Sequence, residues 1–172
     1  MDDHAAGRSM QIVPWSDGDL DLLRAINTPE MTEHLGGPES EAQTVIRHDR
    51  YLTLNANDTG KMFRIVLLPE RVPVGAIGYW ERDWNGDTVY EAGWSVLTSH
   101  QGRGLASTAV GAVIEAARAQ RRRAHLHAFP SVDNPASNAI CRKVGFDLVG
   151  ECEFENPPGT LMRCNDWRVA LT

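Results

Sequence analysis

The chain has 172 residues, is 42% hydrophobic and 23% charged, and carries a formal net charge of −6. This length predicts one domain, and the acidic balance argues against nucleic acid as the main partner, because phosphate binding requires concentrated Lys and Arg. The sequence has no apolar run of roughly 18 residues, its acidic start is unlike a secretory signal, and its three cysteines are scattered, so a cytoplasmic protein without a membrane partner is expected.

Hydrophobic periodicity and turn residues predict the order of strands and helices. In chain order we expect a strand over 10–15, helices over 16–27 and 40–55, strands over 61–68, 72–83 and 87–97, a helix over 104–120, a strand over 123–130, a helix over 134–145, and strands over 146–154 and 159–172. Ser40 is expected to cap the second helix, Asn85-Gly86 to form a hairpin turn, and Arg121–Arg123 to complement a helix dipole. This order is typical of one mixed α/β sheet with helices on both faces, formed by residues 10–172 after a disordered segment over 1–9.

The segment "TSHQGRG" joins the strand over 87–97 to an alanine-rich helix. The first N–H groups of a helix lack internal partners and carry partial positive charge. Gly102 and Gly104 remove side chains at this end, so an anion can approach the backbone, while Gln101 and Arg103 add donors. The turn therefore favours a pyrophosphate site, and a purely structural tight turn is the alternative. It matches neither the glycine-rich pattern of nucleoside-triphosphate loops nor that of dinucleotide folds.

Four segments in order resemble the GNAT family of N-acetyltransferases. "QGRGLA" (101–106) fits the family's pyrophosphate-binding pattern Q/R-x-x-G-x-G/A, and "NPASNAICRKVGF" (134–146) is similar to its following segment. "NTPEMTEHLGGPESEAQ" and "YEAGWSVLTSHQGRGLA" look like the RimJ/RimL-type branch. The resemblance covers about residues 10–172. It implies a single α/β domain with a mixed, mostly antiparallel twisted sheet of about seven strands, in which a splayed strand pair holds acetyl-CoA.

The resemblance implies acetyl-CoA as co-substrate and assigns residues to it. By this analogy the strand before the glycine turn lines the pantetheine arm of acetyl-CoA, and the turn holds the pyrophosphate. Two polar positions further along the chain contact the part of the cofactor beyond the pyrophosphate. The residues implied are Trp94, Ser95, Val96, Leu97, Gln101, Gly102, Arg103, Gly104, Leu105, Ala106, Asn134 and Ser137. Asn134 also precedes a proline at the first helical position, so it is equally expected to cap that helix.

Two side chains are expected to move protons. Glu91 aligns with the glutamate that often serves as general base in this family, and burial in an apolar strand would strengthen it as a base. The alternative is an exposed carboxylate at a strand edge. Where many members place a tyrosine as general acid this chain has Cys141, which we interpret as packing, so Ser137 becomes the candidate acid.

The expected acceptor is a primary amine, either a protein N-terminal α-amine or a small-molecule amine, acetylated by direct transfer in a ternary complex. Glu33, His34 and Trp80 are its candidate binding residues, and a solvated loop and a half-buried strand are the alternatives for them. No metal is expected, although His125 and His127 share a strand face. A non-catalytic CoA-binding sensor and a transferase using another acyl-CoA remain rival functions. C-terminal edge strands could pair with a second copy in a homodimer.

Overall fold

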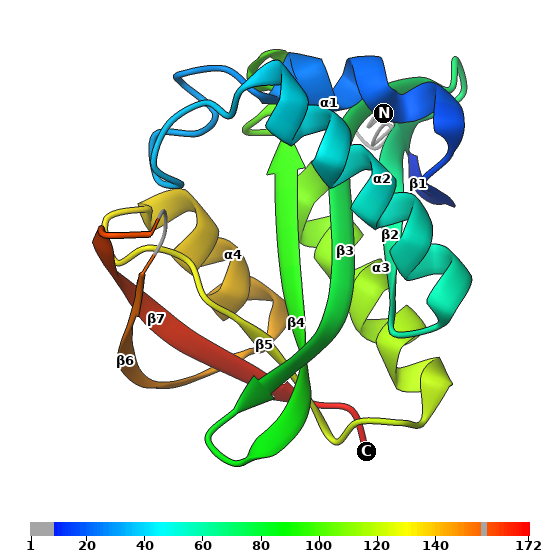
Figure 1. Ribbon diagram of the computed structural model, residues 1–172. Coiled ribbons are helices and arrows are strands. Elements are labelled where there is room, and N and C mark those ends of the chain that lie inside the picture. The colour runs from blue at the N-terminus through cyan, green and yellow to red at the C-terminus, as the bar shows by residue number, and fades with distance from the viewer. Residues whose placement is uncertain (1–8, 156–157) are drawn as a thin grey trace, which may run out of the picture.

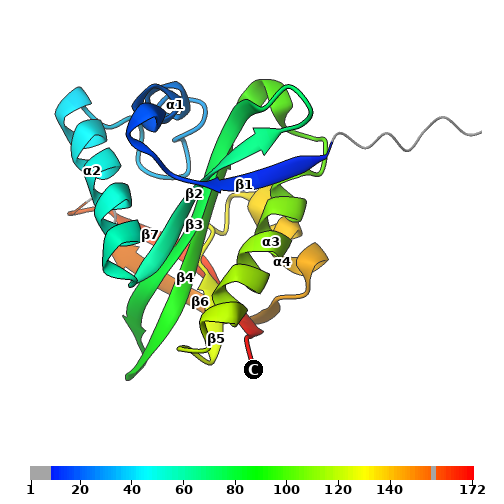
Figure 2. The ribbon, with the colours of Figure 1, turned by 90° about the vertical axis from the view of Figure 1, so that its right-hand side faces the viewer.

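The computed structural model of the protein describes residues 9–155 and 158–172. Its elements in chain order are β1 (Met10–Pro14), η1 (Asp17–Asp19), α1 (Leu20–Ile26), α2 (Glu41–Asn57), β2 (Gly60–Leu67), β3 (Val72–Trp84), β4 (Asp87–Val96), η2 (Thr98–His100), α3 (Leu105–Gln120), β5 (His125–Ala128), α4 (Pro135–Val144), β6 (Asp147–Glu155) and β7 (Leu161–Ala170). Seven strands form one sheet in the order β1-β2-β3-β4-β5-β7-β6. Helices α1 and α2 cover one face, and α3 and α4 cover the other (Figures 1 and 2). The expected mixed α/β fold is confirmed.

Local signals in the sequence account for most element boundaries. The Ser40 hydroxyl accepts a hydrogen bond from the Gln43 backbone N–H, and the Gln43 side chain accepts one from the Ser40 N–H, so α2 begins with a complete capping box. Asn85 and Gly86 both have positive φ, as a two-residue hairpin turn between β3 and β4 requires. Of the predicted disordered segment 1–9, residues 1–8 lie outside the described residues, and the Ser9 carbonyl accepts a hydrogen bond from the Leu68 N–H.

The basic run after α3 also forms ion pairs that the sequence did not predict. Arg121 occupies the C-cap of α3, and the next two guanidiniums turn away to form ion pairs across the molecule. Arg122 pairs with Asp58 after α2, and Arg123 pairs with Glu81 on β3, both at 3.1 Å. The run therefore attaches the end of α3 to other elements, beyond any interaction with the helix dipole.

The two faces of the sheet are packed unequally. Between the sheet and the pair α3 and α4 lies the larger core cluster, which includes the fully buried Ile65, Ile77 and Leu126. The opposite face carries a smaller cluster, in which Trp15, Leu22 and other side chains join α1 to β2 and β3. Because α1 is short, much of this second face remains available for a cavity. Among the residues that the structure describes, no helix combines the length and apolar character needed to cross a membrane.

The sheet opens between β4 and β5, which are the only parallel neighbours among the described strands. Two residue pairs join these strands, Tyr90 with Leu126 and Glu91 with His127. Beyond Glu91, β4 continues to Val96 while β5 ends at Ala128, shorter than the predicted strand over 123–130, and the chain diverges toward α4 (Figure 1). The expected splayed strand pair is therefore present.

Candidate active site

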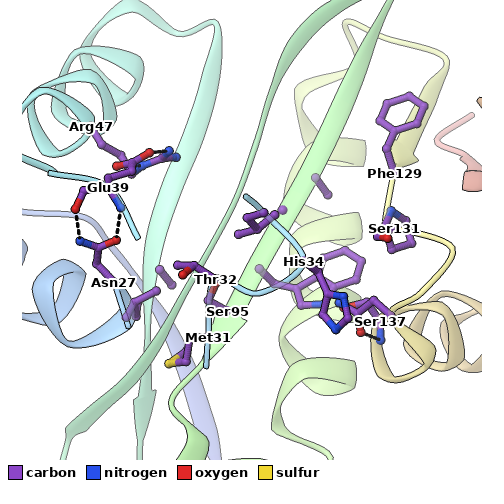
Figure 3. A pocket seen from close by; sticks show the side chains of 18 of the residues that line it. Asn27, Met31, Thr32, His34, Glu39, Arg47, Ser95, Phe129, Ser131 and Ser137 are labelled. Carbon is purple, nitrogen blue, oxygen red and sulfur yellow. Dashed lines mark hydrogen bonds and ion pairs between the residues drawn. The ribbon is translucent and has the colours of Figure 1, made fainter. Parts of the chain in front are cut away.

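A cavity of about 410 Å³ lies on the α1 and α2 side of the sheet, beside the point where β4 and β5 separate. Its walls come from α1, the 28–39 loop, α2, strands β3 and β4, and the segment that leads from β5 into α4. Figure 3 shows Asn27, Glu39 and Arg47 along one wall, with Phe129, Ser131 and Ser137 along the opposite one. The cavity therefore meets the gap in the sheet from the side covered by α1 and α2.

The free edge of β4 offers backbone hydrogen-bonding groups to this gap. The Leu97 N–H donates to the Val74 carbonyl on β3 at 2.8 Å. Because successive residues of a strand direct their peptide groups to opposite edges, those of Trp94 and Val96 face away from β3, toward the opening. An extended chain could add to this edge as a further strand does.

The glycine turn presents bare backbone at the start of α3. Gly102 and Gly104 have φ of 75° and 76°, and a Cβ built on either would meet no atom within 4 Å. Gly104 is the N-cap, and among the described residues no side chain forms a cap hydrogen bond to the start of α3, so its first N–H groups are left for a ligand or solvent. The turn therefore fits the anionic cradle expected from the sequence. The Gln101 amide instead donates to the Val96 carbonyl at 2.9 Å, which fixes the turn to the end of β4.

The start of α4 supplies the opposite side of the gap. The Asn134 side-chain oxygen accepts from the Ser137 N–H at 3.2 Å, so Asn134 is the helix cap, and both residues also line the cavity. Cys141 lies one turn further on, is fully buried in the main core, and does not line the cavity. Burial raises the pKa of its thiol to about 12, as expected of a packing residue and unsuited to a proton donor.

Glu91 lines the cavity at the last residue pair before the strands part. Its side chain is 18% exposed, so it is not the freely solvated carboxylate of the alternative interpretation. One oxygen, Oε2, accepts from Trp80 Nε1 at 3.0 Å and from Arg82 Nη1 at 2.9 Å. The sequence analysis did not foresee Arg82, although the two-residue turn fixes a register that places Trp80 opposite Glu91 and Arg82 diagonal to it.

Arg82 is itself held by aromatic rings from β3, from β6 and from the residue that follows β5. Its guanidinium carbon lies 5.5 Å from the ring centre of Trp84, 5.1 Å from that of Phe129 and 4.3 Å from that of Phe154. Cations at such distances are attracted to the ring faces. The rings therefore fix the guanidinium, and the guanidinium fixes the Glu91 carboxylate.

One histidine of β5 belongs to a buried chain of polar side chains. His127 is buried, and its Nδ1 lies 2.6 Å from Asp166 Oδ1, while Trp84 Nε1 donates to Asp166 Oδ2 at 3.1 Å. This buried polar chain links β5, β7 and β3. Within residues 9–155 and 158–172, no three His, Cys, Asp or Glu side chains are grouped as metal ligands would be.

The candidate acceptor residues are only partly brought together. His34 and Trp80 line the cavity, whereas Glu33 does not and has an exposed side chain. Trp80 packs on Gly93, where an added Cβ would lie 2.8 Å from its ring. The sequence analysis missed Arg47 on α2, which lines the cavity and pairs with Glu39. The two residues are eight positions apart, one before α2 and one within it, and no local pattern identified the pair.

Comparisons with known proteins agree with this geometry. The family model described as acetyltransferase (GNAT) domain matches residues 10–147. Among solved structures, the RimL ribosomal L7/L12 alpha-N-protein acetyltransferase has a TM-score of 0.77 at 20% identity, covering 94% of this chain and 90% of that one. The microcin C7 self immunity acetyltransferase MccE, in complex with acetyl-CoA and AMP, has 0.77 at 16%, covering 94% and 92%.

The aminoglycoside acetyltransferase AAC(6')-Ib, in complex with coenzyme A, has a TM-score of 0.75 at 18% identity, covering 94% and 95%. The search of curated proteins gave no match. At these identities the solved structures establish a shared fold, and the family model, which spans most of the chain, establishes the family. The chain therefore belongs to the GNAT acetyltransferase family and is an acyl-CoA-dependent N-acetyltransferase.

Proposed function

We propose that the protein transfers the acetyl group of acetyl-CoA directly to a primary amine bound in the cavity, with Glu91 as proton acceptor. The observation that carries the proposal is the end of β4–β5 pairing at Glu91. This break places the free edge of β4, the cavity and the Glu91 carboxylate side by side. A thioester lying along that edge would be within reach of an amine entering from the cavity.

The residues of the chain divide between binding and proton movement. The N–H groups at the start of α3 would hold the pyrophosphate, and the edge of β4 at Trp94 and Val96 would hold the pantetheine arm. Acetyl-CoA supplies the thioester, whose acyl carbon accepts the amine nitrogen while the carbon–sulfur bond breaks. Asn134 caps the first turn of α4 through the Ser137 N–H, and the Ser137 hydroxyl would give a proton to the departing sulfur.

The amine must lose a proton before it can attack. For an ordinary alkylamine with a pKa of about 10.4, deprotonation at pH 7 costs roughly 4–5 kcal/mol, whereas for an α-amine near 7.7–8 it costs only about 1–1.5 kcal/mol. Glu91 Oε2 is occupied by Trp80 and Arg82, and in the described part of the chain Oε1 has no protein donor. Oε1 is therefore the atom that would receive the proton, directly or through water.

The cavity wall favours acetyl over a carboxylate-ended acyl group. In the part of the chain that the structure describes, Arg47 is the only arginine lining the cavity, and its guanidinium is engaged by Glu39. A succinyl-type group would therefore find no free cation. This supports acetyl-CoA as the co-substrate.

The test is product analysis by mass spectrometry with acetyl-CoA and a panel of amines, combined with calorimetric titration of acetyl-CoA. We expect an acetylated amine and free CoA. Acetyl-CoA binding without any acetylated product would favour the non-catalytic sensor. Failure to bind acetyl-CoA would refute the assignment of the glycine turn.

A further inference from the structure

We propose that the acceptor carries one ammonium group on an otherwise uncharged, partly apolar body. This inference rests on the proposed transferase function and concerns only which amines the cavity selects. It follows from the charges that line the cavity, because each carboxylate among its described lining residues is already paired with an arginine.

The first of these pairs, Glu39 with Arg47, is firmly built. Arg47 Nε donates to Glu39 Oε2 at 3.0 Å, its Nη2 donates to Oε1, and its Nη1 approaches the Tyr51 hydroxyl. The hydrogen bonds from Arg47 lower the pKa of Glu39, so the pair stays ionised and has no net charge at neutral pH.

The backbone of Glu39 is fixed as well. Its N–H donates to Asn27 Oδ1 and its carbonyl accepts from Asn27 Nδ2, both at 2.8 Å (Figure 3). Asn27 thus joins the 28–39 loop to the end of α1, and the carboxylate cannot easily turn toward a ligand.

The second pair is Glu91 with Arg82, described above. The remaining ionisable side chains on the wall are His34, whose Nε2 lies 3.4 Å from the Glu33 carboxylate, and the phenol of Tyr51. Glu91 has a place for one ammonium group at its free oxygen. Both oxygens of Glu39 accept from Arg47, so no second carboxylate with a free oxygen lines the described cavity to receive another cationic group.

The rest of the wall combines uncharged polar side chains with apolar ones. The apolar side chains include Met31, Leu35, Trp80 and Trp94. A polyamine or an aminoglycoside would have to lose the hydration of its extra ammonium groups without a counter-ion, which is costly. A free amino acid would face the same cost with its carboxylate, because the Arg47 guanidinium is taken by Glu39. An amine beside an uncharged amide or an aromatic ring incurs neither cost.

The test compares acceptors that differ by one group. Phenylalaninamide, phenylalanine and phenylethylamine share a ring and a primary amine, and spermidine supplies the polycation. With the wild-type protein we expect kcat/KM for phenylalaninamide and phenylethylamine to exceed that for phenylalanine and for spermidine by at least about tenfold, the effect of one unpaired buried charge. The ratio of kcat/KM for phenylalaninamide to that for phenylethylamine shows whether the cavity prefers an amine beside a peptide-like amide or a simple alkylamine.

Variants of the ion pair change the cavity charge in a controlled way. Arg47→Met leaves Glu39 unpaired and should raise kcat/KM for spermidine relative to phenylalaninamide by roughly tenfold. Adding Glu39→Gln to Arg47→Met removes the charge and should reverse the gain. Arg24→Met breaks a comparable Arg–Glu pair with Glu41, outside the cavity, and should leave the ratio unchanged. Thermal unfolding of each variant verifies that it is folded.

The outcomes separate the two proposals. Acetyl-CoA binding with no acetylated amine from this panel or the earlier one would refute the transferase proposal. Acetylation of spermidine or phenylalanine as efficiently as phenylalaninamide would leave the transferase in place and overturn the charge-based selection. An unchanged acceptor ratio in folded Arg47→Met would overturn it as well.

Discussion

The glycine turn gives the sharpest test of co-substrate binding, through Gly104→Ala. Gly104 has φ of 76°, and an alanine held in the left-handed region costs roughly 1–2 kcal/mol. For a domain of this size the melting temperature should fall by roughly 2–8 °C. The new Cβ would meet no protein atom within 4 Å, so it would project into the space through which an anion approaches the helix N-terminus.

The interaction of an anion with such an end contributes up to about 2 kcal/mol in partly buried geometries. Loss of about 1.4 kcal/mol corresponds to a tenfold rise in the Kd for acetyl-CoA, which calorimetric titration measures. Gly86→Ala is the matched control: φ there is 82°, a Cβ meets nothing within 4 Å, and the hairpin turn lies outside the cradle. Equal losses of stability in both variants with unchanged acetyl-CoA affinity in Gly104→Ala would refute the anionic cradle.

Three further predictions concern proton transfer and packing. Glu91→Gln should lower kcat by about 10²–10⁴-fold without changing acetyl-CoA affinity. The control is Glu115→Gln on an exposed face of α3. A Glu91→Gln variant with the turnover of the wild-type protein would remove Glu91 from the mechanism. Arg82→Met should lower kcat and should lower the free energy of unfolding by about 2–3 kcal/mol in urea, because it removes the cation–π contacts with three rings and also a partner of Glu91. The control is Arg163→Met on the exposed β6–β7 hairpin, which should cost less than about 1 kcal/mol. Burial raises the pKa of Cys141 from 9.0 to about 12, so the unfolded thiol loses its proton first and stability should fall as the pH rises through this window, by up to about 1.4 kcal/mol per pH unit. Urea midpoints measured across the window should show a shallower slope in Cys141→Ala, and an identical slope would contradict the assignment.

Much of the fold was readable from the sequence because its signals are local. The capping box at Ser40, the Asn85-Gly86 turn and the proline after Asn134 each act within four residues. The glycine turn is equally local, since an uncapped helix start after bare backbone is a property of one short segment. The shortness of β5 was not readable, because the strand ends where its neighbour diverges, which is a tertiary effect.

The charge pairs of the site were harder to predict. Arg82 and Glu91 could have been placed together by extending the hairpin register from Asn85-Gly86, since the side-chain alternation fixes one face. Arg47 and Glu39 meet only because the irregular 28–39 loop folds back on Asn27. No local pattern in the sequence therefore indicates that the charge of Glu39 is cancelled by an ion pair.

The limited pairing between β4 and β5 also bears on how the molecule admits its co-substrate. Below the opening, two residue pairs join the antiparallel halves of the sheet, Tyr90 with Leu126 and Glu91 with His127. The contacts of Asp166 with His127 and Trp84 reinforce this junction. Above it, no ladder between these strands exists to be broken. Insertion of an extended ligand along this edge would therefore break no strand pairing, and entry could proceed without unfolding any part of the sheet.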